Sequence, residues 1–261
     1  MTTIACFKWV VSDQDLRTDP ATHLLDTSRA RREISPYDRN TIECARRVVD
    51  ARSSHAGEGL IGLTVGDITP VGLKDALARG LDSTLQVALP EGGELDGRVT
   101  SHVLAAAIRT IDGADLVLTT EGSADSYAHE TAPRVAELLG WPVLTNVCAL
   151  EIEGTTVRAT RLLDHTLEHV ECELPAVVSV VPEIAPAPIP GLKSVMGAVK
   201  KPKKKVSVED LGLGAEDLSV RTHTVRTTGY VAERRHVRHD GTPQEIAESL
   251  LRALEQDGVL A

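Results

Sequence analysis

The sequence has few aromatic residues, no long apolar run and no excess of positive charge. Its 261 residues include three tyrosines, two tryptophans and one phenylalanine, too few to build a stacking surface for single-stranded nucleic acid. The net charge of −10 also argues against a polyanionic partner, although residues 200–205 are a local basic run. No apolar stretch approaches the roughly 18 residues of a membrane helix, and no basic segment with an apolar core stands at the start. We therefore expect neither export nor membrane insertion.

Paired cysteines are also missing. Cys6, Cys44, Cys148 and Cys172 lie far apart, which gives neither a disulfide framework nor the paired spacing of a metal site. His236 and His239 have no cysteine or carboxylate arranged with them, so we expect no metal site. A reduced, cytoplasmic setting fits these cysteines best.

Hydrophobic periodicity predicts strands that alternate with helices. Unbroken apolar runs predict buried strands at 4–11, 60–65, 84–89, 114–119, 143–147 and 174–181. Apolar residues three and four apart predict helices from the turn at 35–38 to before Ser53, at 70–79, around 103–108 and at 133–139, while 17–32 is predicted to be a surface loop. This order indicates an α/β fold, an open and mostly parallel sheet with helices on both faces.

The pattern changes after residue 149. Residues 150–160 are typical of a hairpin with Gly154 at its turn, and 166–172 alternate as an antiparallel strand does. Four prolines between Pro182 and Pro190 exclude regular structure there, and no helix is predicted between Lys200 and Thr242. We expect an α/β domain at 1–199 and an extended C-terminal arm with one helix at 200–261. Such an arm either packs on a partner or is disordered.

Ligands of an open parallel sheet bind at the carboxyl ends of its strands. The loops there are 6–13, 66–67 and 121–131. The last has small residues and leads into a helix, so its backbone N–H groups can hold a phosphate. The alternative is a helix start capped by Asp125 or Ser126, which needs no ligand.

Common catalytic and nucleotide motifs are not found. There is no Gly-x-Gly-x-x-Gly after the first strand and no Gly-Lys-Ser/Thr loop. Residues 122–126 resemble the pyrophosphatase-type loop of ATP-cleaving ligases, but here the loop follows the fourth predicted strand, not the first. No serine–histidine–acid set or carboxylate pair is indicated, and His129 alone is a solvated polar group. We therefore expect no catalytic residue.

Residues 159–179 resemble the signature of the electron transfer flavoprotein beta subunit. The residues at the signature's spacing are Arg161, Asp164, Glu168, Pro175, Val177, Val178 and Ser179, whereas His165 and Thr166 depart from it. Three further segments agree: Cys6–Lys8 with Asp13 and Asp15, residues 35–43, and residues 189–202. In detail they are most similar to the FixA-like branch of the family.

The resemblance implies an adenine nucleotide alpha hydrolase-like fold and a heterodimer. An alpha subunit carries the redox FAD and passes electrons between flavin dehydrogenases and an acceptor, while the beta subunit buries an AMP. By position, the nucleotide contacts are Cys6, Ser35, Pro36, Tyr37, Asp38, Val65, Gly66, Gly122, Ser123, Ala124, Asp125, Ser126, Tyr127, Ala128, His129, Glu130 and Thr131. Thr131 matches a family threonine, whereas His129 and Glu130 replace amide or small residues.

The resemblance also implies a recognition loop at 187–197 that docks the dehydrogenase. Leu192 holds its anchor position, beside Ile189 and Pro190. The alternative is an ordinary loop leucine folded back on its own domain. Two other functions stay open: a bifurcating subunit that holds a second FAD and accepts electrons from NADH, and a nucleotide-binding stress or regulatory homodimer.

Overall fold

A computed structural model describes residues 1–52, 59–91, 93–230 and 235–260. The chain forms two compact units. The larger one, which we call the sheet domain, consists of Met1–Arg17 and Asp26–Thr227. The smaller one, which we call the arm unit, consists of Thr18–Leu25 and Thr228–Ala261.

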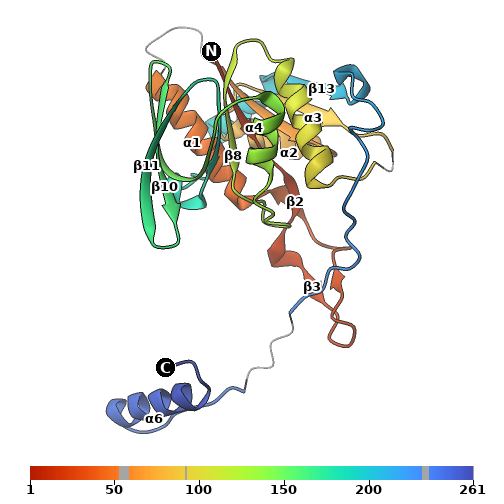
Figure 1. Ribbon diagram of the computed structural model, residues 1–261. Helices are drawn as coiled ribbons and strands as arrows, with labels where there is room; N and C mark the ends of the chain where they lie inside the picture. The colour runs from red at the N-terminus through yellow and green to blue at the C-terminus, as the bar shows by residue number, and fades with distance from the viewer. Residues whose placement is uncertain (53–58, 92, 231–234, 261) are drawn as a thin grey trace. The chain divides into compact units, whose positions relative to one another are not determined.

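The sheet domain is built on one nine-stranded sheet (Figure 1). Its strand order is β11-β10-β9-β12-β8-β1-β6-β7-β13. The parallel part contains β1 (Thr2–Cys6), β6 (Gly59–Val65), β7 (Ser83–Ala88), β8 (Ala114–Thr120), β12 (Ala176–Val180) and β13 (Lys203–Ser207). β1 lies between β6 and β8, where Ile4 pairs with Ile61 and with Val117. The predicted open α/β fold is confirmed.

Helices cover both faces of the sheet, as predicted. α1 (Pro36–Arg52) and α2 (Pro70–Ala78) pack their apolar stripes into one core, which includes Ile42, Ala45 and Leu77. α3 (Gly97–Arg109) and α4 (Thr131–Leu139) share the second core on the other face, where they lie side by side in Figure 1. Because the central strands β1, β8 and β12 are buried on both sides, their sequences are mostly apolar.

The first predicted strand, 4–11, is two strands. β1 ends at Cys6, and β2 (Trp9–Val11) pairs antiparallel with β5 (Arg32–Ile34) in a separate small sheet. The chain leaves the main sheet at Lys8, whose backbone N–H donates to the Asp38 carboxylate at 2.7 Å and whose carbonyl accepts from the N–H of Ser35 at 3.0 Å. These two bonds replace the ladder that a single strand would have made.

The antiparallel part of the sheet is a meander of β9 (Val143–Glu153), β10 (Thr156–Leu163) and β11 (Thr166–Glu173). Gly154, at φ +61°, forms the predicted turn. The predicted strand 143–147 and the first hairpin strand are one long strand, β9. Residues 143–147 of β9 pair in parallel with β12, and residues 147–153 pair antiparallel with β10. Asn146, at φ +56°, lies near the register shift of each ladder.

The predicted domain boundary at residue 199 lies too early. After the 3₁₀ turn η2 (Pro182–Ile184), the short helix α5 (Leu192–Gly197) and the turn η3 (Ala198–Lys200), the chain forms the edge strand β13 beside β7. The ammonium of Lys201 donates to the carbonyls of Leu77 and Leu81 at 3.2 and 2.5 Å. Part of the basic run therefore joins the edge of the sheet domain, which continues through the turn η4 (Glu209–Leu211) to Thr227.

Residues 13–26 and the arm unit add further elements outside the main sheet. The 3₁₀ turn η1 (Asp13–Asp15) comes just before the loop predicted at 17–32. The loop itself contains two-residue strands, β3 (Arg17–Thr18) and β4 (Leu25–Asp26), which pair with each other. In the arm unit, Leu24 bridges Thr228, and α6 (Pro243–Gln256) begins with a capping box between Thr242 and Glu245, close to its predicted start. None of the helices in the described ranges is long and apolar enough to cross a membrane.

Candidate functional site

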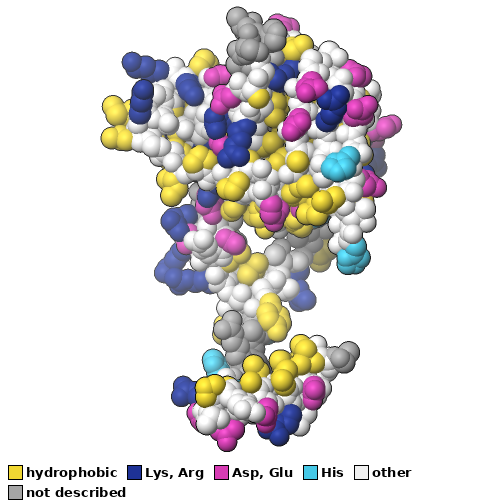
Figure 2. Space-filling model, turned by 90° about the vertical axis from the view of Figure 1, so that its left-hand side faces the viewer, with side chains coloured by type: hydrophobic (Ala, Val, Ile, Leu, Met, Phe, Trp, Pro, Cys, Tyr) yellow, Lys and Arg dark blue, Asp and Glu magenta, His cyan; other side chains and the backbone are white. Residues whose placement is uncertain are grey.

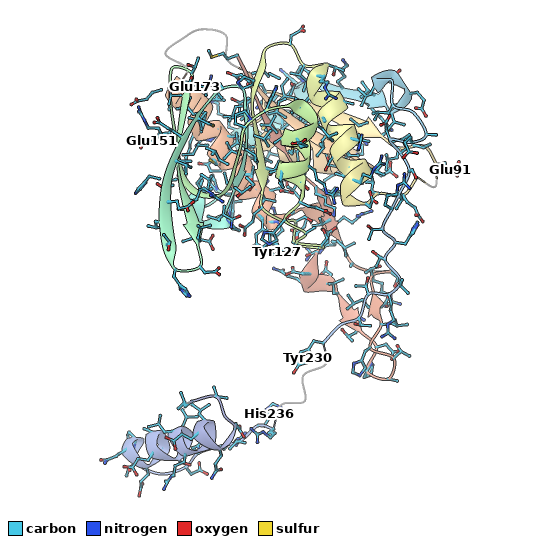
Figure 3. All side chains as sticks on the ribbon, viewed as in Figure 1. Glu91, Tyr127, Glu151, Glu173, Tyr230 and His236 are labelled. Atoms are coloured by element: carbon cyan, nitrogen blue, oxygen red, sulfur yellow. The ribbon has the colours of Figure 1, made fainter. Side chains whose placement is uncertain are left out.

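The carboxyl ends of three neighbouring strands form the candidate site. β1 ends at Cys6, β6 is followed by Gly66, and β8 is followed by Glu121. Because β1 lies between the other two, the three predicted loops start side by side. Figure 3 shows Tyr127, from the loop after β8, at this edge of the sheet.

Asp38, in the first turn of α1, is the buried acidic group of the site. Its side chain is only 3% exposed, and it accepts the Lys8 N–H described above. Burial raises the pKa of Asp38 to about 7; the bond from Lys8 opposes this rise, and the nearby Asp125 adds to it. Burial likewise raises the pKa of the Cys6 thiol to about 12, so Cys6 contributes a small apolar wall and not a nucleophile.

The loop after β8 is fastened to β1 and α1 by polar contacts. The ammonium of Lys8 lies 2.8 Å from a carboxylate oxygen of Asp125. Ser123 donates to Asp125 at 2.5 Å, and the backbone N–H of Ala124 donates to the hydroxyl of Ser35 at 3.2 Å. Burial raises the pKa of Asp125, but the bonds from Lys8 and Ser123 outweigh it and leave the pKa below its usual value. Asp125 is therefore a carboxylate near neutral pH.

The start of α4 has no side-chain cap. Its N-cap residue is Glu130, at φ −114° and ψ −15°, and no side chain accepts a bond from the first turn. The alternative that Asp125 or Ser126 caps this helix is wrong. Both side chains stay inside the loop, where the Ser126 hydroxyl lies 3.1 Å from that of Ser123. The N–H groups of Thr131 and Ala132, the first two residues of α4, therefore have no side-chain acceptor within the described chain. Pro133 has no N–H, and the N–H of Arg134 donates to the Glu130 carbonyl at 3.2 Å.

Aromatic rings line the outer side of the loop. The ring of Tyr127 meets those of Tyr37 and His129 edge to face, with centroid distances of 5.6 and 4.5 Å. Its hydroxyl donates to Glu121. Tyr127 and His129 have positive φ values of 44° and 56°, a conformation that is strained for side chains of this size. A Cβ on Gly122 would lie 2.7 Å from the Tyr127 ring, so glycine is needed for this packing.

A hollow of about 470 Å³ opens beside these rings. It is lined by Tyr37, Glu121, Tyr127, Leu162, Leu163, Asp164, Val181, Pro182 and Glu183. The signature residue Asp164 thus lies near the loop, whereas Arg161 and Glu168 pair with each other at 2.8 Å on the hairpin. The three carboxylates that line the hollow, Glu121, Asp164 and Glu183, would repel a phosphate.

Glu130 turns away from the loop's backbone groups. Its carboxylate pairs with Arg134 at 2.7 Å and packs against Gly97, the first residue of α3. An acidic side chain beside a candidate phosphate site is unfavourable unless it is paired or points elsewhere. Here both conditions are met, so Glu130 does not oppose an anion at the start of α4.

The remaining predicted residues lie around the same edge. Gly66, at φ +90°, follows Val65 and is fixed at both backbone groups: its N–H donates to the Val87 carbonyl and its carbonyl accepts from Gln86, each at 2.9 Å. Pro36 begins α1, Ala128 is exposed on the loop and Thr131 is half buried. Gln86 and Lys8 were not among the predicted site residues. A single lysine in an apolar run, 4–11, was the available signal for Lys8.

The predicted docking residues lie elsewhere, on and before α5. Ile189 is 94% exposed and Leu192 is 76% exposed, while Pro190 is half buried. The alternative in which Leu192 folds back on its own domain does not agree with this exposure. In the described part of the chain, no group of three or more His, Cys, Asp or Glu side chains has an arrangement that would hold a metal ion.

Fold and site together define an open α/β protein of the Rossmann-like type. Residues 22–211 match the family model of the electron transfer flavoprotein domain, which is more than half of the chain. The chain belongs to this family. Its members are flavin-associated electron carriers that usually work with partner subunits and dehydrogenases.

Proposed function

We propose that this chain is the beta subunit, of the FixA-like branch, in a cytoplasmic heterodimeric electron transfer flavoprotein, and that it holds a structural AMP. The observation that carries the proposal is the meeting of three parallel strand ends with the uncapped start of α4. The free N–H groups and the positive end of the helix dipole suit a phosphate group. Glycine and serine in the adjoining loop allow its backbone to approach closely.

The nucleotide contacts we propose are those predicted from the sequence, with Lys8 added. The phosphate is held by the loop 122–131 and by Thr131 at the helix start. Lys8 supplies a positive charge at this loop, because its ammonium pairs with Asp125 of the loop at 2.8 Å. The buried Cys6 and Gly66 and the half-buried Val65 give the remaining wall of the site.

The chain's own residues bind and orient; none of them acts as an acid, base or nucleophile in this proposal. The FAD of the alpha subunit supplies the redox chemistry. The arm unit packs on that subunit through α6, whose apolar side chains gather along one side in Figure 2. Leu250 and Leu251 of α6 are 45% and 52% exposed, although an amphipathic helix normally buries its apolar face.

The flavin dehydrogenase docks on the recognition loop 187–197. Ile189 and Leu192 offer exposed apolar side chains, and Lys193 and Lys200 are exposed beside them. An apolar anchor with a charged rim suits a contact that must form and break at each transfer.

Ligand analysis of the complex with a co-expressed flavin-bearing alpha subunit tests the proposal. We expect a heterodimer that contains one FAD and one AMP. A content of two FAD per heterodimer, together with reduction by NADH, would instead indicate that this chain holds a bifurcating FAD in place of AMP. A homodimer that binds nucleotide without any flavin-bearing partner would contradict the assignment to a heterodimer.

A further inference from the structure

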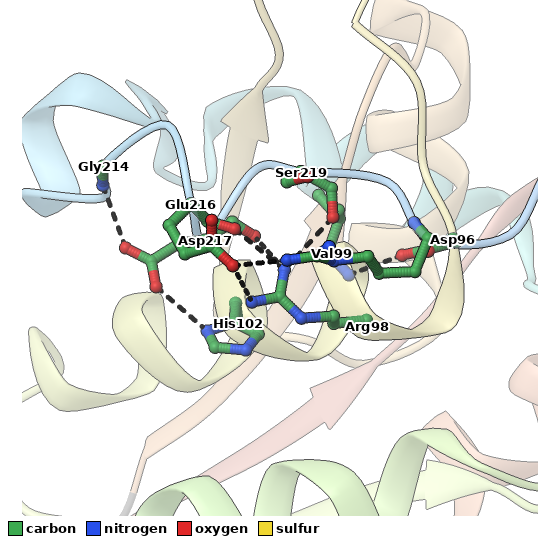
Figure 4. Close-up of polar contacts among 9 residues, drawn as sticks. Asp96, Arg98, Val99, His102, Gly214, Glu216, Asp217 and Ser219 are labelled. Carbon is green, nitrogen blue, oxygen red and sulfur yellow. Dashed lines mark hydrogen bonds and ion pairs between the residues drawn. The ribbon is translucent and has the colours of Figure 1, made fainter.

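Residues 214–223, which we call the strap, run along the N-terminal half of α3 (Figure 4). They follow β13 and η4 and belong to the sheet domain. Arg98 holds the middle of the strap: its Nη1 donates to the carbonyls of Glu216, Asp217 and Ser219 at 2.9, 3.4 and 3.1 Å. One guanidinium therefore satisfies three backbone acceptors of a segment that has no helix or strand of its own.

Asp96 holds the end of the strap, and its two oxygens have different partners. Oδ1 accepts the N–H of Val99 at 2.7 Å and so caps α3. Oδ2 accepts the N–H groups of Arg221 and Thr222 at 2.7 and 3.1 Å. The same side chain thus starts a helix of the sheet domain and fixes the backbone of the strap.

Two further contacts hold the strap along its length. Asp217 accepts the N–H of Gly214 at 2.9 Å and lies 3.3 Å from Nδ1 of His102 on α3. Beyond Asp96, Nδ1 of His223 lies 3.1 Å from Glu94. The following residues differ: Val225 is 97% exposed, and the C-terminal segment of the arm unit begins at Thr228, which bridges Leu24 of the same unit. Attachment to α3 therefore ends a few residues before the arm.

We propose that Asp96 and Arg98 anchor the strap and thereby keep the link between α3 and the C-terminal segment of the arm unit short. This step rests on the proposed function, because the arm is the part assigned to the alpha subunit. Without the anchor the link to Thr228, which bridges Leu24, would begin near residue 214 and not after 223, and binding the partner would have to order those residues as well. Ordering the backbone of even one residue weakens binding by about tenfold. Asp96 and Arg98 act as positioning residues for the arm.

Trypsin cleavage of the isolated full chain tests the anchor without any partner. Its two informative sites are the bonds after Arg221, inside the strap, and after Arg226, beyond it. In the wild type we expect cleavage after Arg226 to be at least tenfold faster, because Asp96 holds the residues on both sides of the first bond. D96N keeps a carbonyl oxygen for Val99 but loses the second acceptor, and D96S keeps only a cap. Both variants, and R98A, should bring the two rates close together.

R109A is the matched control, since Arg109 lies on the same helix but donates to Leu138 of α4. Its cleavage ratio should stay at the wild-type value. Equal rates in the wild type, or unchanged ratios in D96N, D96S and R98A, would overturn the anchor.

Dissociation of the complex with the co-expressed alpha subunit tests the effect on the partner. We expect D96N and D96S to dissociate about tenfold faster than the wild type and R109A, with the unfolding midpoint of the sheet domain nearly unchanged. Dissociation at the wild-type rate despite an altered cleavage ratio would overturn the link to the arm. If the wild type binds no such subunit, the proposed function fails, whereas the cleavage ratio still decides the anchor.

Discussion

The carboxylate of Glu130 lies directly against the backbone of Gly97. A Cβ built on Gly97 would lie 1.9 Å from Oε1 of Glu130, which is far inside van der Waals contact. Gly97 is the first residue of α3 and Glu130 is the last loop residue before α4. A negative side chain beside the start of α3 is favourable, because this end of the helix carries partial positive charge. The contact therefore fixes the loop's end against the neighbouring helix.

Replacing Gly97 by alanine should displace Glu130 and destabilise the fold. We expect G97A to lower the free energy of unfolding by about 0.5–1 kcal/mol, since the carboxylate, at the end of a flexible side chain, must swing away from its partly exposed position beside Arg134. In the E130A background the same change should be neutral or stabilising, because alanine is the better helix former. Urea unfolding of both single variants and the double variant measures the coupling. G197A, where the added methyl meets nothing within 4 Å, is the control; equal effects of G97A in both backgrounds would contradict the contact.

The raised pKa of Asp38 gives stability a specific pH dependence. The carboxyl binds its proton up to about pH 7 in the folded chain but only to about its ordinary value of 3.8 when unfolded. The folded state thus holds more protons between these values. This group's stabilising contribution is full below pH 3.8 and is lost as the pH rises toward 7, by an amount on the order of a few kcal/mol.

The variant D38N isolates this effect, because asparagine is neutral and its carbonyl can still accept the Lys8 N–H. We expect the difference in unfolding free energy, D38N minus wild type, to increase between pH 5 and pH 8. Urea titrations at four pH values measure it. A difference that stays constant over this range would show that Asp38 is ionised throughout.

Local patterns predict the sheet and its helices well, because apolar periodicity records which faces are buried. Contacts between distant residues explain where the prediction fails. The strand predicted at 4–11 breaks at Lys8 because Asp38, thirty residues away, takes its N–H. The domain boundary at 199 was wrong because Lys201 binds carbonyls near the end of α2 and the next residues pair with β7. Neither contact leaves a pattern in the local sequence.

The candidate site was likewise predictable in part. Its place follows from the sequence, since the ends of adjacent parallel strands meet at one edge. That α4 begins without a side-chain cap could not be predicted, because Asp125 has the residue type of an N-cap but bonds to Lys8 and Ser123. The position of Glu130 depends on the absence of a side chain at Gly97, which only the packed helices reveal.

Removing Lys8 and removing Asp125 should affect nucleotide binding differently, although the two side chains form one ion pair. Both side chains are partly exposed, at 48% and 37%, so losing the pair should cost less than about 1 kcal/mol of stability. K8M removes the positive charge near the proposed phosphate and should weaken AMP binding about tenfold. D125N leaves that charge free of its carboxylate and should leave binding unchanged or stronger. Calorimetric titration with AMP at low and high salt measures both, and weakening by D125N equal to that by K8M would contradict a direct role of Lys8.

The exposed side chain of Leu192 predicts a loss confined to electron exchange. L192A removes apolar area from the proposed docking surface, so the second-order rate constant for reduction by the partner dehydrogenase should fall about tenfold. Heterodimer content, FAD and AMP should stay unchanged, because Leu192 lies outside the candidate nucleotide site. L167A is the matched control, a leucine on β11 that is 58% exposed. Stopped-flow flavin reduction measures the rates; an L192A rate equal to those of the wild type and L167A would remove Leu192 from the docking surface.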